Sequence, residues 1–77
     1  MEKIDLAIGR VLKRIRLRQG LSQEELSFDA TLHRTYISQL ERGLKSITVK
    51  KLVQITNVLN ITIDCFMKEV MNELDKL

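Results

Sequence analysis

The sequence predicts an all-α domain of five helices, and three observations support this fold class. The chain contains no proline and only three glycines, so few positions would interrupt a helix. Apolar residues recur at every third or fourth position, which is the spacing of one buried helix face. Ser22, Thr48 and Thr62 precede three of these apolar runs, as short polar residues do at helix N-termini.

The length and composition restrict the kind of protein that this chain can form. Seventy-seven residues allow one domain, over residues 1–77. A lone cysteine and a lone histidine exclude an internal disulfide and a four-ligand soft metal site, so no metal or cofactor is expected. No stretch approaches the roughly 20 apolar residues of a membrane span, and no signal-peptide pattern opens the chain. A cytoplasmic protein is therefore expected.

The first helix is expected over about residues 4–19. Its apolar residues form a single stripe: Ile4, Ile8, Val11, Leu12 and Ile15. Gly20 follows at the position where a left-handed residue commonly closes a helix. Ser22 and Glu25 then have the spacing of a capping box, which predicts that a second, short helix begins at once and covers about residues 23–30.

Three further helices are expected, over about residues 34–42, 49–59 and 63–77. Gly43 closes the third, Thr48 caps the fourth and Thr62 caps the fifth. The second and third helices are short and only about three residues apart. This is the helix-turn-helix arrangement, and it covers about residues 23–42.

One face of the third helix carries only polar side chains that suit DNA. At about 100° per residue, Ile37 and Leu40 fall on the buried side. The outward side carries Arg34, Thr35, Ser38, Gln39 and Arg42. Arginine can bind guanine, glutamine can bind adenine and threonine can contact the thymine methyl group. An ordinary solvated helix face is the alternative at this point.

The net charge of +3 is distributed unevenly. Residues 1–20 carry six bases and two acids, residues 31–51 carry five bases and one acid, and residues 52–77 carry two bases and four acids. The basic segments 1–20 and 31–51 and the acidic segment 52–77 favour contact of one face with a polyanion, although plain solvated surfaces remain the alternative. Four bases of the first helix are expected to form diffuse positive surface: Arg10, Lys13, Arg14 and Arg18.

The segments LSQEEL at residues 21–26 and RTYISQLERG at residues 34–43 resemble the Cro/lambda-repressor-type (Xre-type) helix-turn-helix family. The similarity extends from about Ile8 to Phe66. It implies a five-helix, lambda-repressor-like fold and a DNA-binding function. Residues 34–38, with only a short C-terminal helix behind them, are also similar to the controller proteins of restriction–modification systems. Those are small dimeric regulators of their own operon and of the endonuclease gene.

The resemblance implies roles for individual positions. The positions that match base-reading residues in the major groove are Arg34, Thr35, Ser38 and Gln39. The positions that match contacts to DNA phosphates are Gln23, Tyr36, Arg42, Lys45 and Ser46. Packing of the Tyr36 ring, and an ordinary exposed loop at Lys45 and Ser46, are the structural alternatives. Arg16 and Glu41 match an ion pair that ties the first helix to the end of the third.

The chain departs from the family's pattern where glycine is common. Thr31 stands in the turn before the third helix, and Asn60 stands at the end of the fourth. Asparagine tolerates a left-handed backbone, whereas threonine would be strained there. The turn at Thr31 is therefore expected to adopt a different backbone.

The fifth helix carries a continuous apolar stripe: Ile63, Phe66, Met67, Val70, Met71 and Leu74. We interpret it as the interface of a two-fold homodimer in which the fifth helices pack on each other, and a helix folded back on its own core is the alternative. Such a dimer would place two reading helices about 34–36 Å apart and would require a palindromic operator in double-stranded DNA. Cys65 is expected to be buried or near this interface.

Together these patterns predict a dimeric, sequence-specific transcriptional regulator, and the resemblance to controller proteins implies that it controls its own gene, with restriction–modification genes as further targets. An enzyme is not expected, because His33 stands at the N-cap of the reading helix and Glu24 and Glu25 are helix-start charges. The alternative is a protein-interaction module, such as an antitoxin or an antirepressor-binding regulator. Activation would require contact with RNA polymerase, and no residue pattern marks a surface for it.

Overall fold

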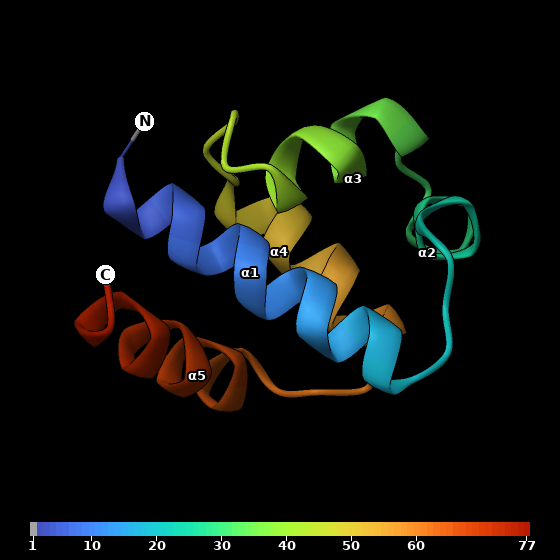
Figure 1. Cartoon of the computed structure of the whole chain (residues 1–77). Coiled ribbons are helices and arrows are strands. Elements are labelled where there is room, and N and C mark those ends of the chain that lie inside the picture. The colour runs from blue at the N-terminus through green and yellow to red at the C-terminus, as the bar shows by residue number, and fades with distance from the viewer. Residues whose placement is uncertain (1) are drawn as a thin grey trace.

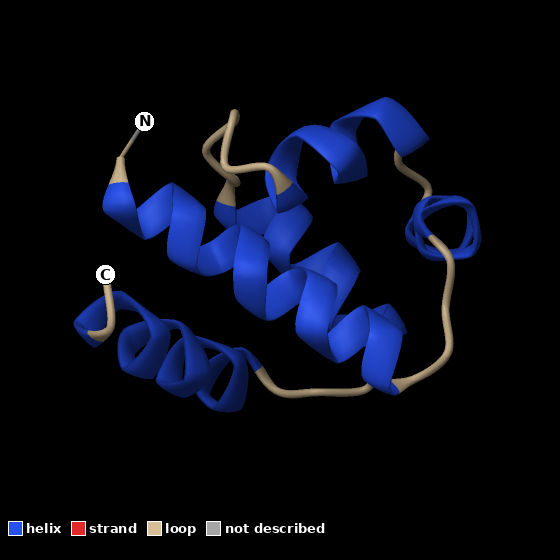
Figure 2. Cartoon of the chain, viewed as in Figure 1, coloured by secondary structure: helices blue, strands red, loops and turns tan. Residues whose placement is uncertain are grey.

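The computed structural model describes residues 2–77, which form five helices and no strand (Figure 2). The helices are α1 (Lys3–Arg18), α2 (Gln23–Ala30), α3 (Arg34–Glu41), α4 (Val49–Val58) and α5 (Ile63–Asp75). The predicted all-α class and the order of the helices are confirmed, and helix ends differ from the predicted ones by at most two residues. None of these helices has the length and apolarity that crossing a membrane requires.

Side-chain caps determine where α2, α4 and α5 begin. The Ser22 hydroxyl accepts a hydrogen bond from the Glu25 amide at 2.9 Å, and the Glu25 carboxylate accepts one from the Ser22 amide at 2.9 Å. These two bonds lower the pKa of Glu25. The Thr48 and Thr62 hydroxyls each accept from the amide three residues later. The predicted capping box and both predicted threonine caps are therefore present.

The core lies around α1, which runs through the middle of the domain with α3 and α5 packed against it (Figure 1). Every helix contributes fully buried side chains, among them Leu12, Ile15, Leu26, Ile37, Leu40, Ile55 and Phe66. Ile37 and Leu40 anchor α3, as its periodicity predicts. The opposite face of α3 is consequently left to solvent.

The packing of α5 against α1 contradicts part of the predicted dimer stripe. Phe66 and Val70 are only 1% and 0% exposed inside their own core, so they have no surface to offer a second copy. Leu74 is partly buried against the same core. Cys65 is exposed, so the expectation that it is buried is wrong, while its place near a dimer interface stays a prediction. The part of the stripe that retains accessible surface consists of the exposed Ile63 and Met71 and the partly buried Met67 and Leu74.

Ion pairs between α1 and α5 show that the expected diffuse positive surface on α1 is largely wrong. The buried Glu73 carboxylate pairs with Arg10, at 3.4 Å, and with Arg14. Glu69 lies 3.9 Å from Arg14 and 3.6 Å from Arg18. The hydrogen bond from Arg14 is the main cause that lowers the pKa of Glu73. The acids of α5 thus neutralise positive charge on α1, which leaves less of it for a polyanion.

The turn between α2 and α3 keeps the left-handed backbone despite its threonine. Thr31 has φ 59° and ψ 44°, so the expectation of a different backbone is wrong, while Asn60 has φ 53° as expected. The Thr31 and Leu32 amides donate to carbonyls of the last turn of α2, at 3.2 and 2.8 Å. These two bonds satisfy backbone carbonyls at the C-terminal end of α2, as they do in helices that end at a glycine. They offset the cost of about 1–2 kcal/mol that a left-handed backbone imposes on a residue with a side chain.

Candidate nucleic-acid interface

The four predicted base-reading side chains lie together on the face of α3 that points away from the core. Arg34 and Thr35 are exposed, and Ser38 and Gln39 are partly exposed. Arg34 has no carboxylate within ion-pair distance among the described residues. These groups are therefore accessible to base edges, whereas Ile37 and Leu40 on the opposite side hold the helix in place.

A nearly buried ion pair fixes the end of α3 to α1. The Arg16 Nε and Nη2 atoms donate to the two Glu41 carboxylate oxygens at 2.6 and 2.9 Å. The two side chains are 7% and 3% exposed. The remaining Arg16 Nη1 donates to the Leu21 carbonyl at 2.8 Å. The hydrogen bond to Glu41 raises the pKa of Arg16. The predicted pair is thus present in bidentate form, which sets both the position and the angle of α3.

Gln23, at the first position of α2, extends this network. Its Nε2 donates to the Glu41 Oε1 at 3.0 Å, so one carboxylate receives bonds from both α1 and α2. This contact ties the start of α2 to the end of α3. A phosphate contact by Gln23 stays a prediction.

The other residues predicted to contact phosphates differ in whether their side chains already have a partner within the protein. Lys45 and Arg42 are exposed, and neither pairs with a carboxylate of residues 2–77, although the Arg42 Nε lies 3.4 Å from the Ser38 carbonyl. Ser46, in contrast, donates its hydroxyl to the Asp5 carboxylate at 3.0 Å. That carboxylate would repel a phosphate at the same place. The position of Ser46 beside this carboxylate therefore does not favour the predicted phosphate contact.

Unpaired positive charge gathers around α3 and the start of α4. Within residues 2–77, no carboxylate pairs with any of the five bases Arg34, Arg42, Lys45, Lys50 and Lys51. The one acid among residues 31–51, Glu41, is occupied by Arg16. On α1, by contrast, all four arginines are paired. The face that the charge distribution predicts for contact with a polyanion would therefore lie at α3 and the start of α4 rather than along α1, and the contact itself stays a prediction.

Tyr36 occupies the side of α3 that faces α4. Its ring is partly buried against the core, and the Lys51 ammonium lies 4.4 Å from the ring centroid. The phenol oxygen is buried without a hydrogen-bond partner of good geometry, and the backbone of Thr48 is the polar group beside it. Burial raises the pKa of Tyr36. Lys51 was not among the predicted site residues, because only tertiary packing brings it to Tyr36.

His33 is the N-cap residue of α3, as predicted, but its side chain caps nothing. Its backbone is extended at φ −76° and ψ 141°, and its exposed imidazole makes no cap hydrogen bond. The imidazole therefore remains accessible at the N-terminal end of the reading helix.

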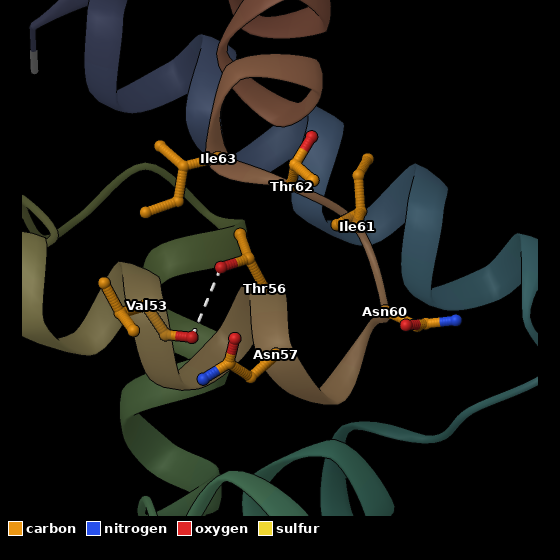
Figure 3. Close-up of a pocket in the computed structure, with 7 residues that line it drawn as sticks. All are labelled: Val53, Thr56, Asn57, Asn60, Ile61, Thr62 and Ile63. Carbon is orange, nitrogen blue, oxygen red and sulfur yellow. Dashed lines mark hydrogen bonds between the residues drawn. The ribbon is translucent and has the colours of Figure 1, made fainter.

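A second surface, without charged residues, lies where α4 leads into α5 (Figure 3). A hollow of about 410 Å³ lies there, and its wall combines the apolar Val53 and Ile63 with polar residues such as Thr56. Val53 and Ile63 are 38% and 36% exposed, and Val49, one turn before Val53, is 75% exposed. The valines were missed at the sequence level. Their signal was that α4 carries more apolar residues than one buried stripe can hold.

Comparison with known proteins supports this architecture. The helix-turn-helix family model HTH_3 matches residues 12–64. Control protein C.BamHI from Bacillus amyloliquefaciens is 39% identical over 59 residues, which cover 75% of this chain and 73% of that protein. Control protein C.MunI from Mycoplasma sp. is 31% identical over 77 residues, which cover 99% of each chain.

A solved structure is similar over nearly the whole length. It is that of the restriction–modification controller protein C.Esp1396I, crystallised as a tetramer in complex with its natural 35 base-pair operator. It aligns with a TM-score of 0.88 and 32% identity, covering 96% of this chain and 97% of that one. The chain therefore belongs to the helix-turn-helix family, as its motif at residues 21–43 predicts.

Proposed function

We propose that this protein is a sequence-specific DNA-binding regulator of transcription that places α3 in the major groove of its operator. The observation that carries the proposal is the outward face of α3, where the four predicted base-reading residues are at least partly exposed and form no ion pair within residues 2–77. The bidentate Arg16–Glu41 pair holds this face rigidly, and unpaired bases flank it. Rigid presentation lowers the ordering cost of binding.

We further propose that the genes under control include its own and those of a restriction–modification system, and that the protein acts in the cytoplasm. The support is the similarity to the control proteins C.BamHI and C.MunI and to C.Esp1396I, whose operator complex has been solved. The similarity to C.Esp1396I extends over 96% of this chain and so includes α5 as well as the motif.

Replacing Arg34 with alanine tests the DNA-reading function. The operator is first selected from random duplexes with the wild-type protein, and affinities for it and for a scrambled duplex are then measured by fluorescence anisotropy. Loss of one bidentate base contact is expected to weaken operator binding by about 10- to 100-fold per half-site, since such contacts contribute roughly 1–3 kcal/mol. Affinity for the scrambled duplex should change far less.

Lys13→Ala is the matched control, because Lys13 is an exposed base on α1 that pairs with no acid of the described residues. It should keep the preference for the operator. A wild-type protein that selects no sequence and binds all duplexes equally weakly would contradict the proposal. That result would favour the protein-interaction module instead.

We infer that the DNA-binding form is a homodimer, and that two copies pair through the apolar surface of α4 and α5. This surface consists of Val49, Val53, Ile63, Met67 and Met71. This surface replaces the interface predicted on α5 alone, because Phe66 and Val70 are buried in the core. The hollow in this surface has no charged residue in its wall, and C.Esp1396I, the similar controller protein, is a tetramer on its operator. Pairing here would present two α3 helices to the two halves of a palindrome.

Val53→Asp is expected to convert the dimer to a monomer, because two carboxylates would face each other across the two-fold axis. Sedimentation equilibrium measures the mass, and circular dichroism checks that the helices persist. Leu17→Asp is the control, since Leu17 is also an exposed apolar residue, at 57%, but lies at the end of α1. An unchanged mass for Val53→Asp would refute this interface.

A further inference from the structure

A hollow of about 380 Å³ lies between the α2–α3 turn, the reading helix and the start of α4. Its wall includes Thr35, Tyr36, Gln39, Lys45 and Lys51. Two of them carry positive charge and none is acidic. Thr35 and Gln39 also belong to the base-reading face, so the hollow opens beside the groove that α3 would occupy.

The lining of this hollow is unusual within the described residues. The hollow on α2 is lined by Glu24, Glu25 and Asp29 and would repel an anion. The hollow between α4 and α5 has no charged residue in its wall. The remaining hollow, at the end of α2, has only the His33 imidazole as a titratable group. Two ammonium groups therefore line only one of these four hollows, and that hollow is the one next to α3.

Lys51 is held in the wall by a contact that does not neutralise it. Its Nζ lies 4.4 Å from the centroid of the Tyr36 ring, and no carboxylate of the described residues pairs with it. A cation–π contact orients an ammonium group while leaving its charge available to an anion. The Tyr36 hydroxyl is buried and has no hydrogen-bond partner within residues 2–77, so it is not accessible to a ligand in the hollow. The wall thus offers two ammonium groups that no carboxylate of the described residues neutralises.

We propose that this hollow binds one backbone phosphate of the DNA duplex, with Lys45 and Lys51 as its cationic ligands. The inference rests on the proposed function and adds Lys51, on α4, to the DNA-contacting residues. A phosphate contact positions the protein but carries no sequence information. Lys51 therefore contributes equally to binding of every duplex, in contrast to Arg34.

The test compares Lys51→Gln with Lys51→Arg and Lys50→Gln. Lys50 is the matched control, because it is an adjacent, exposed and unpaired base that does not line the hollow. Affinities for the selected operator and for a scrambled duplex are measured over a series of salt concentrations, and thermal melts verify folding. Lys51→Gln is expected to weaken binding to both duplexes by the same factor, roughly 5- to 10-fold. The slope of log K against log salt should fall by about 0.9 per protomer.

Lys51→Arg should retain both the affinity and the slope, because it keeps the charge, whereas Lys50→Gln should change the slope less than Lys51→Gln does. An unchanged slope in Lys51→Gln, an equal change in Lys50→Gln, or a loss confined to the operator would each overturn the proposal. Arg34→Ala tests the proposed DNA-reading function independently of the phosphate site. If Arg34→Ala abolishes operator preference while Lys51→Gln has no effect, the protein reads DNA but this phosphate site does not exist.

Discussion

Replacing Glu41 with leucine is expected to lower the free energy of unfolding by about 3–5 kcal/mol, because it strands a buried charge. Arg16 is only 7% exposed on its side chain and donates two hydrogen bonds to Glu41. Gln23 donates a third bond to the same carboxylate. A small domain has a total stability of roughly 5–15 kcal/mol, so this single change would remove much of it. Urea unfolding followed by circular dichroism measures the loss.

The double variant Arg16→Met/Glu41→Leu separates two free energies: the cost of leaving Arg16 buried without a partner, and the net contribution of the ion pair to stability. With both charged groups replaced by apolar ones, most of the lost stability is expected to return, because no ion remains buried without a partner. Operator affinity should not return to the same degree, since the bidentate bonds that orient α3 are absent. Near-wild-type unfolding of the single Glu41→Leu variant would show that water solvates Arg16 and that the pair is not structural.

Gly9→Ala is expected to destabilise the domain by about 2 kcal/mol, although alanine favours a helix interior by about 1 kcal/mol over glycine. A Cβ at this position would lie 2.3 Å from the Leu40 carbonyl oxygen and 2.7 Å from that of Glu41. Both are backbone atoms, so no side-chain rotation can relieve the contact. Overpacking of a tight core costs roughly 1–3 kcal/mol or more, and here α1 and α3 must separate. We expect the melting temperature to fall by roughly 10 °C.

Gly20→Ala provides the comparison for Gly9→Ala. A Cβ at Gly20 meets no atom within 4 Å, and the only penalty is its left-handed backbone at φ 72°. This variant should lose about 1–2 kcal/mol of stability but keep operator affinity. Gly9→Ala should lose both, because separating α1 from α3 also displaces Arg16 from Glu41. A Gly9→Ala protein as stable as the wild type would mean that the two helices can move apart at no cost.

Features that depend on neighbours along the chain could be predicted from the order of the amino acids. A cap such as Ser22 bonds to the amide three residues later, and an apolar stripe such as that of α1 repeats within each turn. These interactions are local, so the five helices and the outward face of α3 could be predicted. The Arg16–Glu41 pair was predictable only through the family resemblance, because its partners are 25 positions apart.

Which helix faces pack into the core and which remain exposed depends on how the helices pack in three dimensions. Periodicity indicates which residues of α5 share a side, but not that Phe66 and Val70 would fill the core while Val53 of α4 remained exposed. Charge counts likewise could not show that Glu73 pairs with Arg14 across 59 positions. Lys51 remained free beside Tyr36 for the same reason. Ion pairing and burial depend on distance in space, and that distance is fixed only when the helices pack together.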